Sequence, residues 1–289
     1  MVDEGEFLKA VKETIKKSVL ELPIDVVNAL KTAYEKEDSP VGRTILNSIL
    51  NNIELAKNLR KPICQDTGLP LFIVEIGRSF SDCKLDYERI LTEAVREATV
   101  EVPLRPNCVD PLTDKNTGDN TGKLAPSIIY EFNNTDRLTI TYFPKGAGSE
   151  NQTGLYMLPP SASFSDIKKI ILNHVVEKAS FSCPPVIVGV GLGGGADIAL
   201  TLAKKALTRP IGLKNPELKL ADMEIQLLTL INKTGIGPMG LGGSTTALSV
   251  HIDYACRHTA SLPVAVSLLC WAARRAQLII DGKHRYKIV

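Results

Sequence analysis

Apolar residues recur at helical spacing in the first sixty residues. In residues 3–20 this stripe consists of Phe7, Val11, Ile15, Val19 and Leu20. A second helix is expected over about 24–36. A third helix is expected from Ser39-Pro40 to about Leu59, because serine favours the N-cap and proline the first helical turn. We therefore predict an N-terminal helical layer over about 1–60, with a structural role.

After this layer, strand-like and helix-like patterns alternate. The run 71–76 is apolar and rich in β-branched residues, which is typical of a buried strand. Strands at about 126–132 and 137–143 are expected to form a hairpin. Further strands are expected at about 186–190, 247–254 and 276–280, and helices at 85–100, 165–179, 196–207 and 217–233. The pattern predicts one α+β domain over 1–289, in one or two lobes, with mixed sheets.

Composition narrows the class of protein. The chain has 289 residues, of which 44% are hydrophobic and 23% charged, which is typical of a globular protein. A net charge of +2 gives no field that would attract nucleic acid or an anionic membrane. The N-terminus lacks the apolar core of a signal peptide, and no apolar run reaches the roughly eighteen residues of a membrane span. We expect a cytoplasmic protein.

The six cysteines are spread thinly over the chain, at positions 64, 83, 108, 183, 256 and 270. This is not the density of a disulfide scaffold, and a reducing compartment would keep them as thiols. No C-x-x-C motif occurs. Any metal site that uses these thiols must combine distant parts of the chain.

The segment Lys61-Pro-Ile-Cys-Gln-Asp-Thr-Gly-Leu-Pro70 concentrates reactive side chains in a rigid turn before a buried strand. Burying such polar groups is costly unless something binds them. Cys64 and Asp66 are therefore candidate ligand or catalytic residues. The alternative, a buried thiol beside a turn-forming aspartate, fits this segment alone about equally well.

Three later segments offer anion-binding chemistry. Arg105 in an irregular segment can hold a carboxylate with two hydrogen bonds, although a surface arginine in a turn is the simpler interpretation. The loop 145–153 has glycines whose backbone N–H groups can bind an anion, but its lysine comes first, unlike in a P-loop. Arg257 and His258 leave a strand together and can bind an anionic substrate, or serve as a solvated arginine and a capping histidine.

The glycines Gly189, Gly191 and Gly194 match G-x-G-x-x-G between a strand and a helix, which is the pattern of a dinucleotide-binding fold. That fold requires a second strand ending in an acidic residue about twenty residues later. The chain instead reads Thr208-Arg-Pro-Ile-Gly-Leu-Lys-Asn-Pro216 there. A nicotinamide-dependent oxidoreductase is therefore kept only as an alternative of another class, beside a non-catalytic assembly protein with free thiols.

Taken together, these segments resemble one family. The matching residues are Cys64-Gln-Asp-Thr-Gly68, Lys145-Gly-Ala-Gly-Ser149, Cys183-Pro-Pro185, Gly240-Leu-Gly-Gly243, Arg257-His258 and Cys270. In this order they resemble the class I fumarase and tartrate dehydratase family of iron–sulfur hydro-lyases. The resemblance runs from about residue 40 onward.

The resemblance implies a [4Fe-4S] cluster held by Cys64, Cys183 and Cys270, with one iron that no cysteine binds. Four thiolates would suit electron transfer, whereas three leave an iron free to act as a Lewis acid. The single-chain fumarases carry Cys-Pro where this chain has Leu262-Pro263. The remaining cysteines, Cys83, Cys108 and Cys256, are then expected to be ordinary buried thiols.

The resemblance also assigns roles around a small dicarboxylate substrate. Arg105, Arg257, Gln65 and the N–H groups around Gly146 and Gly148 would orient its carboxylates. Asp66 and His258 would be the catalytic residues, serving proton transfer or orientation.

The chain ends where single-chain members of the family continue into a second domain. It is therefore similar to the α subunit of a two-subunit enzyme with a separate β subunit, expected as α₂β₂ and inactive as α alone. Fumarate hydratase, an enzyme of the tricarboxylic acid cycle, is the first expectation. L-Tartrate dehydratase is the alternative, because the motifs do not resolve the substrate.

Overall fold

The computed structural model describes residues 3–81 and 85–289 of the chain. These residues form two compact units. Unit 1 contains residues up to 23, 53–147 and 274–289, and unit 2 contains 24–52 and 148–273. Cys83 lies outside the described residues. Among the described residues, no helix combines the length and the hydrophobicity that crossing a membrane requires.

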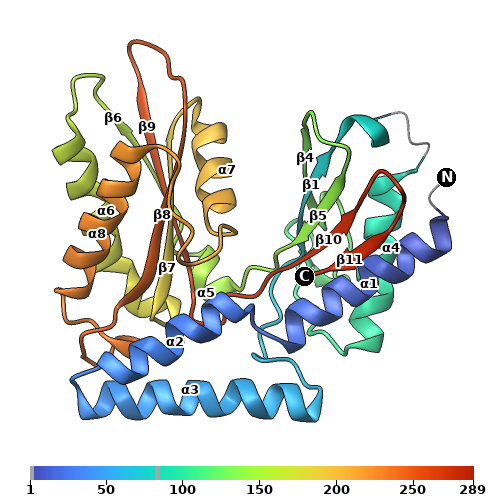
Figure 1. The fold of residues 1–289 in the computed structure, drawn as a ribbon, viewed down its shortest axis with the longest axis horizontal. Coiled ribbons are helices and arrows are strands. Elements are labelled where there is room, and N and C mark those ends of the chain that lie inside the picture. Colours follow the sequence, from blue (N-terminus) through green and yellow to red (C-terminus); the bar gives the residue numbers. More distant parts are fainter. Residues whose placement is uncertain (1–2, 82–84) are drawn as a thin grey trace. The chain divides into compact units, whose positions relative to one another are not determined.

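All the predicted helices are present (Figure 1). They are α1 Glu4–Leu20, α2 Ile24–Lys36, α3 Pro40–Leu59, α4 Tyr87–Glu101, α6 Phe164–Lys178, α7 Ala196–Ala206 and α8 Leu218–Asn232. The cap of α6 is Ser163, which forms a reciprocal capping box with Asp166. The N-terminal helices contribute to both units: α1 packs against α4 in unit 1, whereas α2 belongs to unit 2.

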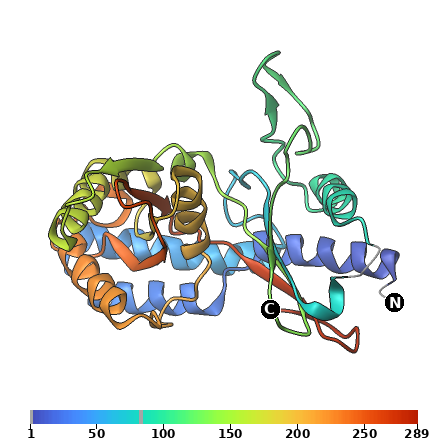
Figure 2. The ribbon, with the colours of Figure 1, turned by 90° about the horizontal axis from the view of Figure 1, so that it is seen from above.

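Unit 1 is built on a five-stranded mixed sheet in the order β11-β10-β5-β1-β4. Its strands are β1 Leu71–Ile76, β4 Ser127–Phe132, β5 Leu138–Tyr142, β10 Ala276–Ile280 and β11 Tyr286–Ile288. Apolar residues of α1 and α4 pack with those of this sheet in a single core. A small separate hairpin, β2 Val109–Asp110 with β3 Lys115–Asn116, extends away from this core (Figure 2).

The predicted hairpin between the strands near 126–132 and 137–143 is wrong. Both strands exist, but β1 lies between them, parallel to β4 and antiparallel to β5. The physical reason is burial: β1 is apolar almost throughout and takes a central position. The outer strand β4 leaves Tyr130 and Phe132 exposed, as an edge strand can.

Unit 2 is built on a four-stranded sheet in the order β6-β9-β7-β8. Its strands are β6 Gly154–Leu158, β7 Val186–Gly193, β8 Ala247–Ala255 and β9 Leu262–Leu269, with β7 and β8 parallel. Helices α6 and α8 cover one face, and α7 covers the other (Figure 1). Strands β6 and β9 are not among the predicted elements.

The glycines of the G-x-G-x-x-G match serve the packing of α7 on the sheet. A Cβ atom at Gly189 would lie 2.2 Å from the carbonyl oxygen of Ala203, and one at Gly191 would lie 2.0 Å from that of Ala199. Only glycine therefore lets α7 approach β7 this closely. The strand that pairs with β7 in parallel is β8, and the helices α7 and α8 lie between these two strands in the chain.

Candidate functional site

The turn that contains Cys64, Gln65 and Asp66 leads directly into β1 in unit 1. Cys64 and Asp66 are half-buried, and Gln65 is exposed. Gly68 has a φ of +81°, and a Cβ atom there would lie 2.9 Å from the backbone nitrogen of Lys145. Glycine at this position therefore lets the turn lie against the segment that begins at Lys145.

The carboxylate of Asp66 accepts hydrogen bonds from three segments of unit 1. Its Oδ1 accepts the N–H of Gly68 at 3.0 Å and the side-chain amide of Asn107 at 3.2 Å. Its Oδ2 accepts the N–H of Ala147 at 2.9 Å. A Cβ atom at Gly146 would lie 2.8 Å from this oxygen, so only glycine leaves room for the carboxylate. The orientation of Asp66 is thus fixed before any ligand binds.

The glycine loop 145–153 makes a contact that the sequence does not predict. Its residues 147–150 form a short helix, α5 Ala147–Glu150, which the sequence pattern does not predict. The N–H of Ala147 binds Asp66, so part of the loop's donor capacity orients a catalytic candidate. The anion contacts expected at Gly146 and Gly148 stay predictions.

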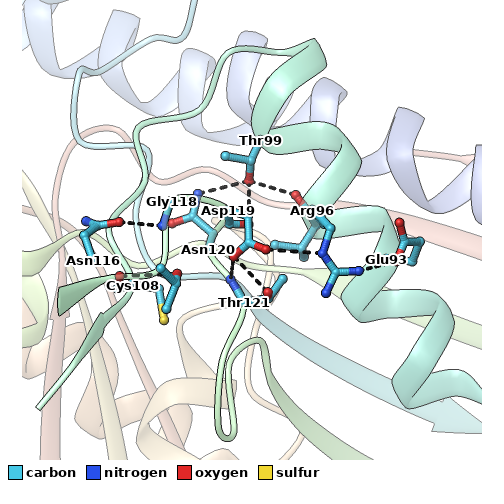
Figure 3. Close-up of polar contacts among 11 residues, drawn as sticks. Glu93, Arg96, Thr99, Cys108, Asn116, Gly118, Asp119, Asn120 and Thr121 are labelled. Carbon is cyan, nitrogen blue, oxygen red and sulfur yellow. Dashed lines mark hydrogen bonds and ion pairs between the residues drawn. The ribbon is translucent and has the colours of Figure 1, made fainter. Parts of the chain in front are cut away.

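The backbone of Arg105 is held by two buried polar residues. Thr67 Oγ1 accepts the Arg105 N–H at 3.1 Å, and the Asn120 side-chain amide donates to the Arg105 carbonyl oxygen at 3.1 Å. Asn120 also bonds Thr99, as Figure 3 shows. The Arg105 side chain itself is exposed. A buried network thus anchors an arginine whose guanidinium faces solvent.

Unit 2 contains the other two predicted ligand cysteines, and backbone contacts bring their segments together. The N–H of Trp271, directly after Cys270, donates to the carbonyl oxygen of Cys183 at 3.2 Å. The N–H of Cys270 donates to Ser149 Oγ at 3.1 Å. Cys183 is exposed and has a φ of +50°, a left-handed conformation that is uncommon for a residue with a side chain and is found at functional sites.

The glycine-rich loop 234–246 is hydrogen-bonded to the segment that carries Cys183. The N–H of Met239 donates to the carbonyl oxygen of Pro184 at 2.8 Å. A Cβ atom at Gly240 would lie 3.0 Å from Ser180. Glu37, directly after α2 and 2% exposed, accepts the N–H groups of Ser244 and Thr245 at the end of this loop. Sequence reasoning missed Glu37, because its loop partners are distant in the chain.

Arg257 and His258 follow β8 in unit 2. The Arg257 guanidinium donates to the carbonyl oxygens of Pro160, His258, Thr259 and Ser261. It therefore orders the loop that carries His258. The Nδ1 of His258 accepts the N–H of Ala260, so the neutral imidazole carries its proton on Nε2. A substrate contact of Arg257 stays a prediction.

The remaining cysteines differ from one another. Cys108 is buried, as expected. Cys256 is exposed, so its prediction as a buried thiol is wrong. It follows the last residue of β8, where the chain leaves the sheet and enters an exposed loop.

The candidate ligand set is divided between the two units, with Cys64 in unit 1 and Cys183 and Cys270 in unit 2. Within residues 3–81 and 85–289, no three His, Cys, Asp or Glu side chains form a group that could hold a single metal ion.

Comparison with known proteins decides the family. A model of the family described as Fumarate hydratase (Fumerase) matches residues 8–279. The chain belongs to this family. A protein of Methanocaldococcus jannaschii named "Putative L(+)-tartrate dehydratase subunit alpha" is 46% identical over 278 residues, covering 94% of this chain and 98% of that protein. The L(+)-tartrate dehydratase subunit alpha of Escherichia coli K12 is 37% identical over 262 residues, covering 90% and 86%.

These matches confirm the resemblance to the α subunits of the iron–sulfur hydro-lyases, the class I fumarases and tartrate dehydratases. The family supports neither the dinucleotide-binding oxidoreductase nor the non-catalytic assembly protein.

A substitution at Glu37 tests how much its hydrogen bonds to the loop 234–246 contribute to stability. Burial alone raises the pKa of this carboxyl, but hydrogen bonds from the N–H groups of Ser244 and Ser39 outweigh burial and lower the pKa below 4.5. A lowered folded-state pKa stabilises the fold above the unfolded-state pKa, and this contribution is lost as the pH falls through the folded-state pKa. We expect Glu37→Gln to reduce the free energy of unfolding at pH 7 by about 1–3 kcal/mol.

The difference between the wild type and Glu37→Gln should shrink as the pH falls below about 4.5. Urea unfolding at pH 7 and at lower pH measures it. The matched control is Glu35→Gln, an exposed glutamate two residues earlier, which should change little. A difference for Glu37→Gln that does not depend on pH would contradict this assignment.

Proposed function

We propose that this chain is the α subunit of an iron–sulfur L(+)-tartrate dehydratase. The supporting structural observation is the contact between Cys183 and the residue after Cys270, which joins two matching cysteine segments in one unit. The substrate assignment rests on the relatives. They match this chain over most of their length and are named as tartrate dehydratase α subunits. They favour this alternative over the fumarate hydratase expected first.

The donor set fits a [4Fe-4S] cluster. Thiolates are the usual ligands of such clusters, and three of them leave one iron open. Cys183 is exposed on a strained turn, and Cys270 has its backbone N–H fixed by Ser149. Cys64 precedes the fixed carboxylate of Asp66. When bound, the cluster would supply a Lewis acid for the hydroxyl and carboxylate of the substrate.

The chain's own residues would bind and orient the dicarboxylate. The exposed side chains of Gln65 and Arg105 are available to its carboxylates, and an arginine suits such a contact because it binds a carboxylate with two parallel bonds. Asp66, oriented from three sides, would fix the position of the reacting carbon or accept its proton. His258 would donate a hydrogen bond from its Nε2–H to the leaving hydroxyl.

A separate β subunit would complete the site. The relatives are named as α subunits, and the resemblance implies a second domain that single-chain members of the family carry. We propose an α₂β₂ assembly in which the β subunit supplies the remaining side chains of the site.

Activity tests both the subunit assignment and the substrate. The α chain, coexpressed anaerobically with its β subunit, should dehydrate L-tartrate to oxaloacetate with a kcat/KM at least about tenfold that for fumarate hydration, because the site would select the second hydroxyl by hydrogen bonds. The α chain alone should be inactive. A preference for fumarate would make the enzyme a fumarase, and full activity of α alone would refute the two-subunit assignment.

Iron and sulfide content tests the ligand set independently of activity. We expect about four irons per chain after anaerobic reconstitution, with large losses in Cys64→Ala, Cys183→Ala and Cys270→Ala, because each removes one of three thiolates. Cys256→Ala, which removes an exposed thiol outside the ligand set, is the matched control and should retain its iron. Retention of a full cluster in any of the three ligand variants would refute that cysteine as a ligand.

A further inference from the structure

Arg274 belongs to unit 1 and is a buried arginine for which the described part of the chain provides no ion-pair partner. Its side chain is 2% exposed. The Nη2 donates to the carbonyl oxygen of Asp66 at 2.8 Å, whereas Nε and Nη1 are buried with no hydrogen-bond partner. Among residues 3–81 and 85–289, no carboxylate forms an ion pair with it.

The neighbourhood of Arg274 does not neutralise it. Burial raises the pKa of the adjacent Tyr142, with the Arg274 cation acting in the opposite direction, so this phenol is neutral at pH 7. The Asp66 carboxylate is bound to Gly68, Asn107 and Ala147 instead. An arginine does not lose its proton in proteins, and a buried unpaired charge is strongly unfavourable. The two free donors therefore point to a bound anion.

The burial of Arg274 indicates what kind of anion this is. A dicarboxylate that must enter and leave is served by exposed side chains such as those of Gln65 and Arg105. A group 2% exposed suits an anion that stays bound. A [4Fe-4S] cluster with three thiolates carries net negative charge and resides permanently in the protein, and Arg274 contacts the backbone of the turn that carries Cys64.

We infer that Arg274 is the buried counter-cation of the cluster, supplying charge and N–H donors to it at the Cys64 turn. This inference rests on the proposed function. Positive charge and hydrogen bonds near an iron–sulfur cluster stabilise its reduced form and so raise its reduction potential. Groups in this outer position typically change metal affinity by about 10–100-fold when they are removed.

The test compares Arg274→Gln with Arg274→Lys in the anaerobically reconstituted α chain and in the complex with β. Arg274→Gln should lose iron to a chelator about 10–100-fold faster than the wild type and have a more negative reduction potential. Arg274→Lys keeps the charge and should recover most of both properties. Circular dichroism of the cluster-free proteins checks that each variant folds.

Arg209→Gln is the matched control. Arg209 is also a largely buried arginine, but Glu224 pairs with it in unit 2. Its loss should lower the thermal stability of the cluster-free chain without changing the reduction potential. In Arg274→Gln, cluster loading should raise the melting temperature less than in the wild type.

Three outcomes separate this inference from the proposed function. Equal potentials and equal rates of iron loss in wild type and Arg274→Gln would reduce Arg274 to a structural role. A raised KM with an unchanged potential would make it a substrate ligand and overturn the inference. A wild-type chain that assembles no cluster would refute the proposed function itself.

Discussion

The hydrogen bonds to the Asp66 carboxylate are the interaction on which the unit 1 half of the site depends. They join three segments that are far apart in sequence: the turn 64–68, the irregular segment at Asn107 and the start of α5. The glycines at 68 and 146 are required because a Cβ atom at either would collide with this arrangement. The carboxylate is therefore already oriented when a ligand binds, and the free-energy cost of reorganising it is small.

In unit 2, backbone hydrogen bonds hold the segment around Cys183 in place. Cys183 lies in a left-handed turn that is bonded to Trp271 on one side, and Met239 bonds its neighbour Pro184 on the other. Glu37 fixes the far end of the supporting glycine loop. Each cysteine segment of unit 2 is thus held in place by backbone hydrogen bonds to distant parts of the chain.

The sequence predicts local structure well because local rules determine it: helical periodicity located each long helix. Strand pairing was not predictable in the same way. The hairpin prediction failed because adjacency in sequence does not reveal that β1 lies between β4 and β5. The cysteines and Asp66 were recognisable as motif residues, whereas Glu37, Asn120 and Arg274 matter through distant partners that no local pattern indicates.

The central proposal is that three cysteines of this chain hold a cluster and that its iron without a cysteine ligand binds L-tartrate. Mössbauer spectroscopy of the α–β complex loaded with ⁵⁷Fe, recorded with and without L-tartrate, tests it most directly. The account predicts that about one quarter of the iron signal shifts when L-tartrate is added, because one iron of four lacks a cysteine ligand. Four irons that remain unchanged in the presence of L-tartrate would contradict it.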